Sequence, residues 1–206
     1  VWEIEYRRLG HDGAAYPGMF NDVAEATDHL RKIAPQFKLD LSRVVATGHS
    51  AGGHFALWLA ARPHLPKASA LLKADPLPIH AVVGVAAITD IEVFATAGAH
   101  ACGADTVSQL IDQPRRGKAG FADTSPAELK LPVKQWLVQG KDDKLVPAPL
   151  GHAYAEAKRK RGESVDVIDL PNAGHFELIA PWSAAWPPIV EAFGKAFKDI
   201  GRRAAQ

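Results

Sequence analysis

The 206-residue sequence has one cysteine and no marked imbalance of charge, and each of these features excludes a class of protein. The single Cys102 cannot form a disulfide within the chain and has no zinc-type spacing around it. Lys and Arg number 24 against 23 Asp and Glu, so no overall field attracts nucleic acid or an anionic membrane. No apolar run approaches the roughly 18 residues that span a bilayer. We therefore expect no nucleic-acid partner, no membrane partner and no metal.

The rest of the composition is that of an ordinary globular protein, with 47% hydrophobic and 23% charged residues. We expect a single domain over residues 1–206. No secretory signal is visible and a lone cysteine is compatible with a reducing compartment, so we expect a cytoplasmic location. Because the chain starts at Val1, directly inside a strand-like run, a targeting segment upstream of it would not be seen.

Short β-branched runs alternate with helical patterns along the chain. The sequence predicts strands at residues 1–6, 43–47, 79–88, 134–139 and 164–170. Apolar residues at three- and four-residue steps predict helices at residues 20–34, ending before Pro35, and at 53–61, 149–160 and 187–198. This alternation predicts the α/β class, with a mostly parallel sheet and helices on both faces.

The region at about residues 90–131 does not fit the alternation, because four glycines break it into short helical pieces. An insertion of this kind after a strand of an α/β enzyme often forms a cap over the pocket. A plain surface excursion is the alternative, and the sequence leaves both open.

Ser50 lies between a valine-rich strand and an apolar helix, in Gly48-His-Ser-Ala-Gly52. A serine at such a junction is typical of a nucleophile elbow, where glycines are needed because the strained turn brings the flanking residues close together. The alternative is a turn serine that caps a helix. A nucleophilic serine needs a histidine base, and the base needs a carboxylate to orient it.

Reactive groups of an open parallel sheet lie at the carboxyl ends of its strands, and this selects one histidine among nine. His175 follows the last predicted strand in a glycine-bearing loop, Pro171-Asn-Ala-Gly-His175. His49 and His54 flank the serine too closely to approach its hydroxyl from the opposite side. We predict that these two pack around the site or support it.

Three carboxylates follow predicted strands and are candidates for the acid. Asp142 and Asp143 compete, because both follow the strand at 134–139. Asp90 closes the strand at 79–88 and is a reserve candidate, although its commoner role would be to cap the next helix.

Four motifs, in this order, resemble the α/β-hydrolase superfamily, and especially its esterase and lipase branch related to hormone-sensitive lipase, feruloyl-esterase-like and kynurenine-formamidase-like enzymes. The motifs are Tyr6-Arg-Arg with Tyr16-Pro-Gly and Asp22, Gly48-His-Ser-Ala-Gly-Gly-His54, Gly140-x-x-Asp143-x-x-Val-Pro147, and Gly174-His-Phe-Glu-Leu178. The resemblance extends from Val1 to about Phe197, and it selects Asp143 over Asp142.

The resemblance implies a serine hydrolase that cleaves carboxylic esters through an acyl-enzyme and needs no cofactor. Ser50 would be the nucleophile, His175 the base and Asp143 the acid, with the Ala51 N–H in the oxyanion hole. The partner would be a small-molecule ester or amide. Two alternatives stay open: an arylformamidase-like amide hydrolase with the same triad, and a non-catalytic hydrolase-fold domain that binds a ligand.

One departure from the family concerns the chain before Val1. The resembling enzymes carry upstream strands and a His-Gly-Gly type loop that supplies part of the oxyanion hole, and a lost donor commonly costs on the order of 10² to 10³ in turnover. We consider two explanations. In the first, an N-terminal part of the natural protein is missing, and a strand of that part would lie between the predicted strands at Val1 and Val44. In the second, these two strands pair directly and are joined by a right-handed crossover.

Overall fold

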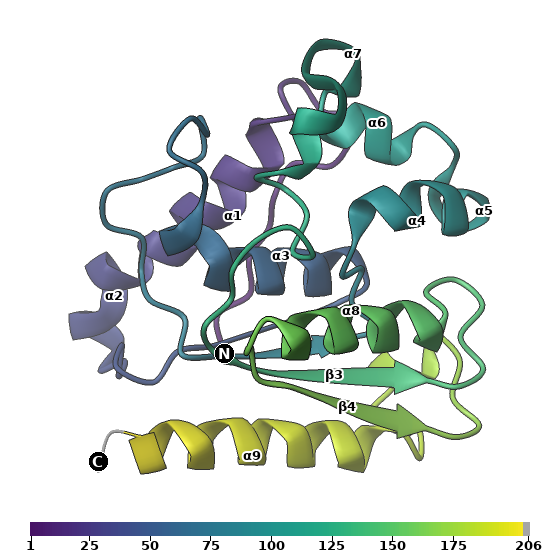
Figure 1. Ribbon diagram of the computed structural model, residues 1–206. Coiled ribbons are helices and arrows are strands. Elements are labelled where there is room, and N and C mark those ends of the chain that lie inside the picture. Colours follow the sequence, from purple (N-terminus) through teal and green to yellow (C-terminus); the bar gives the residue numbers. More distant parts are fainter. Residues whose placement is uncertain (204–206) are drawn as a thin grey trace.

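The computed structural model describes residues 1–203 of the chain. Four parallel strands form one sheet in the order β1-β2-β3-β4 (Figure 1). The strands are β1 (Val45–His49), β2 (Ala81–Val85), β3 (Lys134–Gly140) and β4 (Val165–Leu170). Because all four run in the same direction, their carboxyl ends lie along one edge of the sheet.

Helices cover both faces of this sheet, and alternate strand residues account for the two layers. On one face Val82 and Leu137 pack against α3 (Ala51–Ala61) and α8 (Ala148–Lys160). On the other face Val83 and Val138 pack against α9 (Trp186–Arg203), which lies alone beneath the sheet in Figure 1. β2, in the interior of the sheet, is apolar and buried along its whole length, as expected for a parallel strand between two helical layers. The predicted α/β class is confirmed.

The helix predicted at residues 20–34 is wrong in its continuity and in its end. The structure has α1 (Gly18–Asp28) and α2 (Leu30–Phe37), with a break at His29 and with Pro35 inside α2. A proline inside a helix removes one N–H donor, and its ring crowds the carbonyl four residues earlier, so it disturbs the turn before it. α1 still buries its apolar face, because the Phe20 ring packs edge-on against Trp58 of α3 with 5.0 Å between the ring centroids.

The strand predicted at residues 1–6 is also wrong, and with it the direct pairing of this segment with β1. Residues 1–6 carry no strand in the structure, and the sheet begins with β1. The alternating pattern of the segment has a different cause, since Ile4 and Tyr6 turn toward the core. The Tyr6 ring meets Phe55 of α3 at 5.1 Å. Partial burial of alternate residues therefore does not by itself make a strand, because a strand also requires a hydrogen-bonded neighbour.

The region at 90–131 consists of short helical pieces, as predicted. They are α4 (Ile91–Ala97), α5 (Ala99–Cys102), α6 (Thr106–Leu110), α7 (Gln113–Arg116) and the 3₁₀ turn η2 (Gly117–Phe121). They share a small core of their own, which includes Phe94, Ile111 and Phe121. Val146, from the segment between β3 and α8, also belongs to this core. The insertion is thus packed onto the segment that follows β3.

A buried carboxylate ties the end of the insertion to the N-terminal part of the chain. Asp123 accepts hydrogen bonds from Tyr16 Oη at 3.0 Å, Ser69 Oγ at 2.6 Å and Arg116 Nη2 at 2.6 Å. The guanidinium of Arg116 also lies 3.6 Å from the centre of the Tyr16 ring. Such fully engaged buried charges are costly to break, so this cluster fixes the insertion against the loop before α1.

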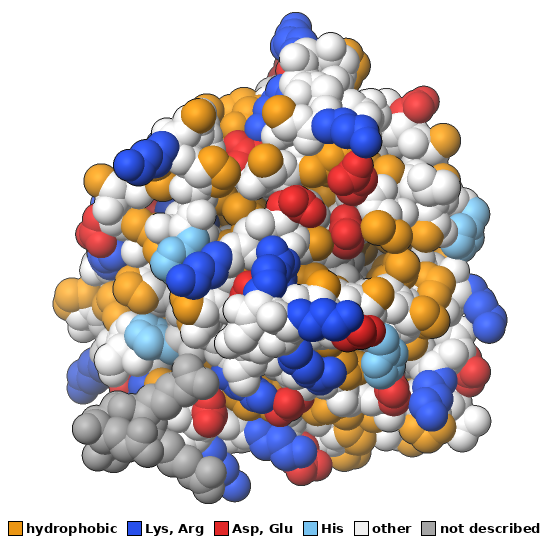
Figure 2. All heavy atoms as spheres, in the orientation of Figure 1, with side chains coloured by type: hydrophobic (Ala, Val, Ile, Leu, Met, Phe, Trp, Pro, Cys, Tyr) orange, Lys and Arg blue, Asp and Glu red, His pale blue; other side chains and the backbone are white. Residues whose placement is uncertain are grey.

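The surface in Figure 2 mixes charges of both signs, in keeping with the balanced composition. Lys, Arg, Asp and Glu side chains are interspersed over this face. Ion pairs of the structure include Lys160–Glu156. None of the helices within residues 1–203 combines the length and the apolar character that crossing a membrane requires.

Candidate active site

Ser50 occupies a strained turn between β1 and α3. Its backbone has φ 57° and ψ −119°, a region that side-chain-bearing residues rarely adopt. Its N–H continues the ladder of the sheet by donating to Val85 O at 3.0 Å, and its carbonyl accepts the His54 N–H of the first turn of α3 at 3.1 Å. Both neighbours hold the turn in place, so the half-buried Ser50 side chain is presented at the carboxyl edge of the sheet.

The glycines of the motif are explained by the close approach of the chain to itself. A Cβ atom built on Gly48 would lie 2.3 Å from the backbone of Gly52, far inside contact distance. A larger residue at position 48 would force the turn to widen, and Ser50 would then lose its present conformation. The Gly48-His-Ser-Ala-Gly52 pattern therefore has the structural cause that the sequence suggested.

Asp143 and His175 are brought together across the carboxyl ends of β3 and β4. His175 Nδ1 donates to Asp143 Oδ2 at 2.7 Å, and both side chains are almost fully buried. The two loops also touch through their main chains, where the Asp142 N–H donates to Ala173 O at 3.0 Å. The structure thus pairs the predicted acid with the predicted base.

The other oxygen of Asp143 is held by main-chain groups that sequence reasoning missed. Asp143 Oδ1 accepts from the N–H groups of Leu145 at 2.8 Å and Val146 at 2.9 Å. An aspartate that bonds the amides two and three residues later is a common turn device, and the polar start of Asp143-Lys-Leu-Val146 was the available signal. The carboxylate is therefore fixed in orientation before it meets the histidine.

The relation between Ser50 and His175 is less direct. His175 lies against His49, the residue before Ser50, with the two ring centroids 4.2 Å apart. Between the described residues Ser50 and His175 themselves there is no side-chain hydrogen bond. Such contacts are often long in ligand-free sites and tighten only when substrate binds. The acid and the base are therefore paired, and the base contacts the residue before the serine.

The remaining acid candidates have other positions. Asp90 caps α4, because its Oδ1 accepts from Glu92 N at 3.0 Å and Val93 N at 3.2 Å. Helix capping is the commoner role that we considered for Asp90, and the two capping hydrogen bonds occupy its carboxylate. Asp142 is exposed to solvent. Of the three carboxylates, Asp143 is the one hydrogen-bonded to His175.

His54 lies one turn into α3 and is buried between the Phe20 and Phe55 rings. Its Nδ1 lies 3.2 Å from Ile88 O, and its Nε2 has no partner in the described part of the chain. Burial lowers the pKa of His54 from 6.5 to about 4, because a charged imidazolium would lose its hydration there. Its neutral form is therefore part of the packing beneath the serine turn.

This buried histidine should make the protein sensitive to acid. The unfolded chain takes up the proton at a pKa near 6.5 and the folded chain only near 4, so the free energy of unfolding should fall as the pH drops through this window. By pH 4.5 the loss from His54 should reach about 2 to 3 kcal/mol. Urea unfolding of wild type and His54→Gln at pH 7 and 4.5 measures it, since glutamine does not titrate. Equal losses in the two proteins would contradict the assignment.

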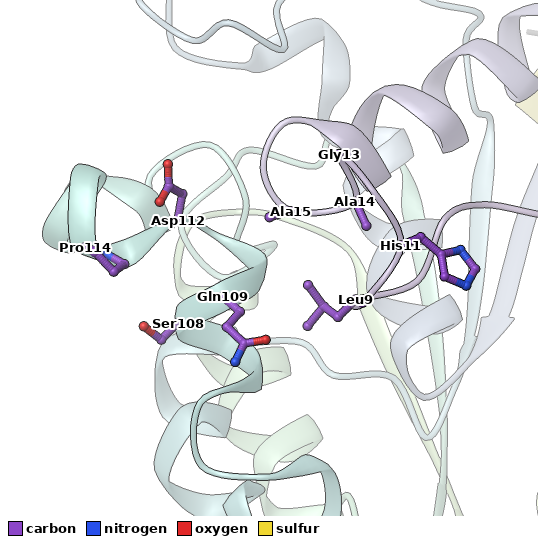
Figure 3. Close-up of a pocket in the computed structure, with 10 residues that line it drawn as sticks. Leu9, His11, Gly13, Ala14, Ala15, Ser108, Gln109, Asp112 and Pro114 are labelled. Carbon is purple, nitrogen blue, oxygen red and sulfur yellow. The ribbon is translucent and has the colours of Figure 1, made fainter.

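A cavity of about 370 Å³ opens between the N-terminal loop and the insertion (Figure 3). Leu9 and Ala14 face it from the loop, and Ser108 and Gln109 face it from α6. Ser50, Asp143 and His175 are not among its lining residues. The candidate active site is therefore defined by the arrangement of its side chains at the sheet edge and not by this cavity.

The parallel sheet with helices on both faces and a strained serine after its first strand is the architecture of the α/β-hydrolase fold. The chain belongs to the BD-FAE family, whose model matches residues 1–157. This confirms the superfamily and branch predicted from the motifs. A comparison with curated protein sequences gave no match.

Solved structures of esterases share this fold at low sequence identity. Est2 of the Planctomycetes species Thermogutta terrifontis is 19% identical, with a TM-score of 0.69 over 96% of this chain and 69% of its own. Esterase B of Lactobacillus rhamnosis is 18% identical, with a TM-score of 0.78 over 97% of this chain and 66% of its own. An acetyl ester-xyloside bifunctional hydrolase of Caldicellulosiruptor lactoaceticus is 18% identical, with a TM-score of 0.69 over 96% and 70%.

Proposed function

We propose that the protein is a serine hydrolase that cleaves carboxylic esters through an acyl-enzyme formed on Ser50. The observation that carries the proposal is the buried hydrogen bond from His175 Nδ1 to Asp143, made at the same edge of the sheet as the strained serine turn. This bond leaves Nε2 as the atom that can accept a proton, because Nδ1 carries one already. The constellation suits acyl transfer and needs no metal or cofactor.

In the proposed reaction the Ser50 hydroxyl attacks the carbonyl carbon of the ester while its proton passes to His175 Nε2. The tetrahedral intermediate then collapses, the bond to the alcohol oxygen breaks, and His175 returns the proton to the departing alcohol. Water repeats the sequence on the acyl-enzyme and releases the acid. Asp143 stabilises the imidazolium at each stage and keeps the ring in its tautomer.

We assign the Ala51 N–H to the oxyanion hole. Ala51 is the first residue of α3, so its N–H has no partner within the helix, and the positive end of the helix lies at the same place. The Ser50 N–H cannot serve, because it donates to Val85 O. Any further donor would have to come from outside these two residues.

We also propose that the insertion at about 90–131 acts as a cap within a single domain. Two contacts join it to the segment that carries the acid. Val146 packs into the insertion's core, and His100 Nε2 lies 2.7 Å from Lys144 O. These contacts bring the insertion beside the carboxyl edge of β3, where a substrate must approach Ser50.

The substrate class that we propose is a small ester with a short acyl group. Similar folds in the comparisons are named as esterases, among them an acetyl ester hydrolase and an esterase with propionate or butyrate bound. An aryl formamide is the amide alternative, since the same triad would serve. Turnover of p-nitrophenyl acetate and butyrate against formyl-kynurenine separates the two classes.

A fluorophosphonate probe tests the nucleophile directly. Ser50 Oγ should bond to phosphorus and expel fluoride, and peptide mapping should find the adduct on the peptide that contains residues 48–52. Heat-unfolded protein is the control, because an unactivated serine does not react. A folded protein that stays unlabelled and hydrolyses none of the three substrates would contradict the proposal and favour a binding domain without catalysis.

A further inference from the structure

His49 contacts the base loop although the two are far apart in the sequence. Its Nε2 lies 3.0 Å from His175 O, and its ring lies against the His175 ring with centroids 4.2 Å apart and planes at 51°. His49 is the last residue of β1, whereas His175 follows β4, and β2 and β3 lie between these strands. The contact therefore joins residues from strands that are three spacings apart in the sheet, about 14 Å.

The hydrogen bond determines the tautomer of His49. A carbonyl oxygen only accepts, so Nε2 of His49 must carry the proton and donate it. The pKa of His49 is lowered by burial, and the charge that His175 can carry lowers it further. Burial thus favours the neutral form of His49 next to the ring that takes up the proton in the proposed reaction.

The main chain just before His175 is also held, because Ala173 O accepts the Asp142 N–H at 3.0 Å. Asn172 adopts a left-handed conformation with φ 55°, and Gly174 follows with its N–H bonded to Glu177 Oε2 at 3.0 Å. Asp143 restrains the ring of His175 through Nδ1, and His49 restrains its carbonyl. The two contacts act at opposite ends of the same residue.

We infer that His49 is a positioning residue, which fixes the main chain of His175 relative to Ser50 by donating from Nε2 to the His175 carbonyl. The inference rests on the proposed function. Through this bond the serine turn and the base loop are held at a set distance, although Ser50 and His175 are not bonded to each other. His49 itself exchanges no proton with the substrate.

Two substitutions separate the donor from the ring. His49→Phe keeps a ring but leaves the buried carbonyl of His175 without a donor, so kcat should fall about 10- to 100-fold with KM changed less than about 3-fold. His49→Gln places an amide N–H near the same position and should restore kcat to within about 3-fold of wild type. His64→Phe, at an exposed position, is the matched control and should match wild type.

The low-field proton resonance of the Asp143–His175 hydrogen bond is a second readout. It should be sharp in wild type and His49→Gln and broadened or lost in His49→Phe, because a looser base loop exchanges its proton with water. Thermal unfolding checks that each variant is folded, and His49→Met replaces His49→Phe if the latter is not. Wild-type kcat and an unchanged resonance in a folded donor-less variant would overturn the inference while the proposed hydrolase activity stands. A wild type without activity removes the proposed function instead, and the resonance alone then decides on His49.

Discussion

Replacing Ser50 with alanine is expected to lower kcat for p-nitrophenyl acetate by about 10⁴-fold or more. The change removes the atom that forms the acyl-enzyme and leaves only binding and the oxyanion donor, which provide a small residual rate in triad enzymes. Because Ala51 and the backbone of the turn stay in place, KM should change little. Steady-state kinetics, together with loss of the fluorophosphonate adduct, measure the effect.

Ser164→Ala is the matched control for this variant. Ser164 is exposed and directly precedes β4, and its carbonyl, not its side chain, accepts from Gln135 N. It should therefore keep wild-type kinetics and labelling. A folded Ser50→Ala protein that retains a tenth of wild-type activity would rule out Ser50 as the nucleophile and require another residue in its place.

Replacing Asp143 with asparagine should lower kcat by about 10³- to 10⁴-fold, through the tautomer of the base. Leu145 and Val146 both donate to Oδ1, so the amide oxygen of the asparagine must take that position. The NH₂ group then faces His175 Nδ1 and donates to it. His175 must accept at Nδ1 and carry its proton on Nε2, where it can no longer take one from Ser50.

The local geometry makes this a sharp test, because asparagine preserves shape and hydrogen-bond count. Asp142→Asn is its control, since Asp142 is the exposed neighbour and should lose less than about 3-fold. Measured kcat for both variants separates the acid from its neighbour. Equal kcat in Asp143→Asn and wild type would show that the His175 tautomer does not depend on Asp143.

Most of the sheet could be predicted from the sequence, whereas the structure of the N-terminal part could not. β3 and β4 were predicted within a residue, because each is a short segment rich in apolar residues between turn residues, Pro132 and Gly140 for β3 and Gly162 and Pro171 for β4. The alternation at residues 1–6 was equally regular, yet no strand pairs with it there. A strand depends on a partner that a local pattern does not contain, whereas burial of Ile4 and Tyr6 needs only a helix beneath them.

In the candidate site, too, local patterns could be predicted and contacts between distant residues could not. Ser50 and His175 could be selected because each follows a strand, and parallel strands bring such positions to one edge. The same argument left Asp142 and Asp143 in competition, and the resemblance of their loop to the family's acid loop selected Asp143. The bond between His49 and His175 joins residues 126 positions apart and leaves no mark on the spacing of either motif. The amides of Leu145 and Val146 were also missed, although an aspartate at the start of a turn commonly bonds the amides two and three residues later.

The position of Val146 has a consequence for attempts to redesign the pocket. Its side chain is seated among Ile111, Phe121 and other residues of the insertion, while its N–H orients the carboxylate of Asp143. The insertion is therefore not a separable module that can be swapped to change selectivity. With Asp143 as the proposed acid, a graft that leaves no space for the Val146 side chain should misalign the Asp143 carboxylate and lower kcat, even if no grafted atom contacts the substrate.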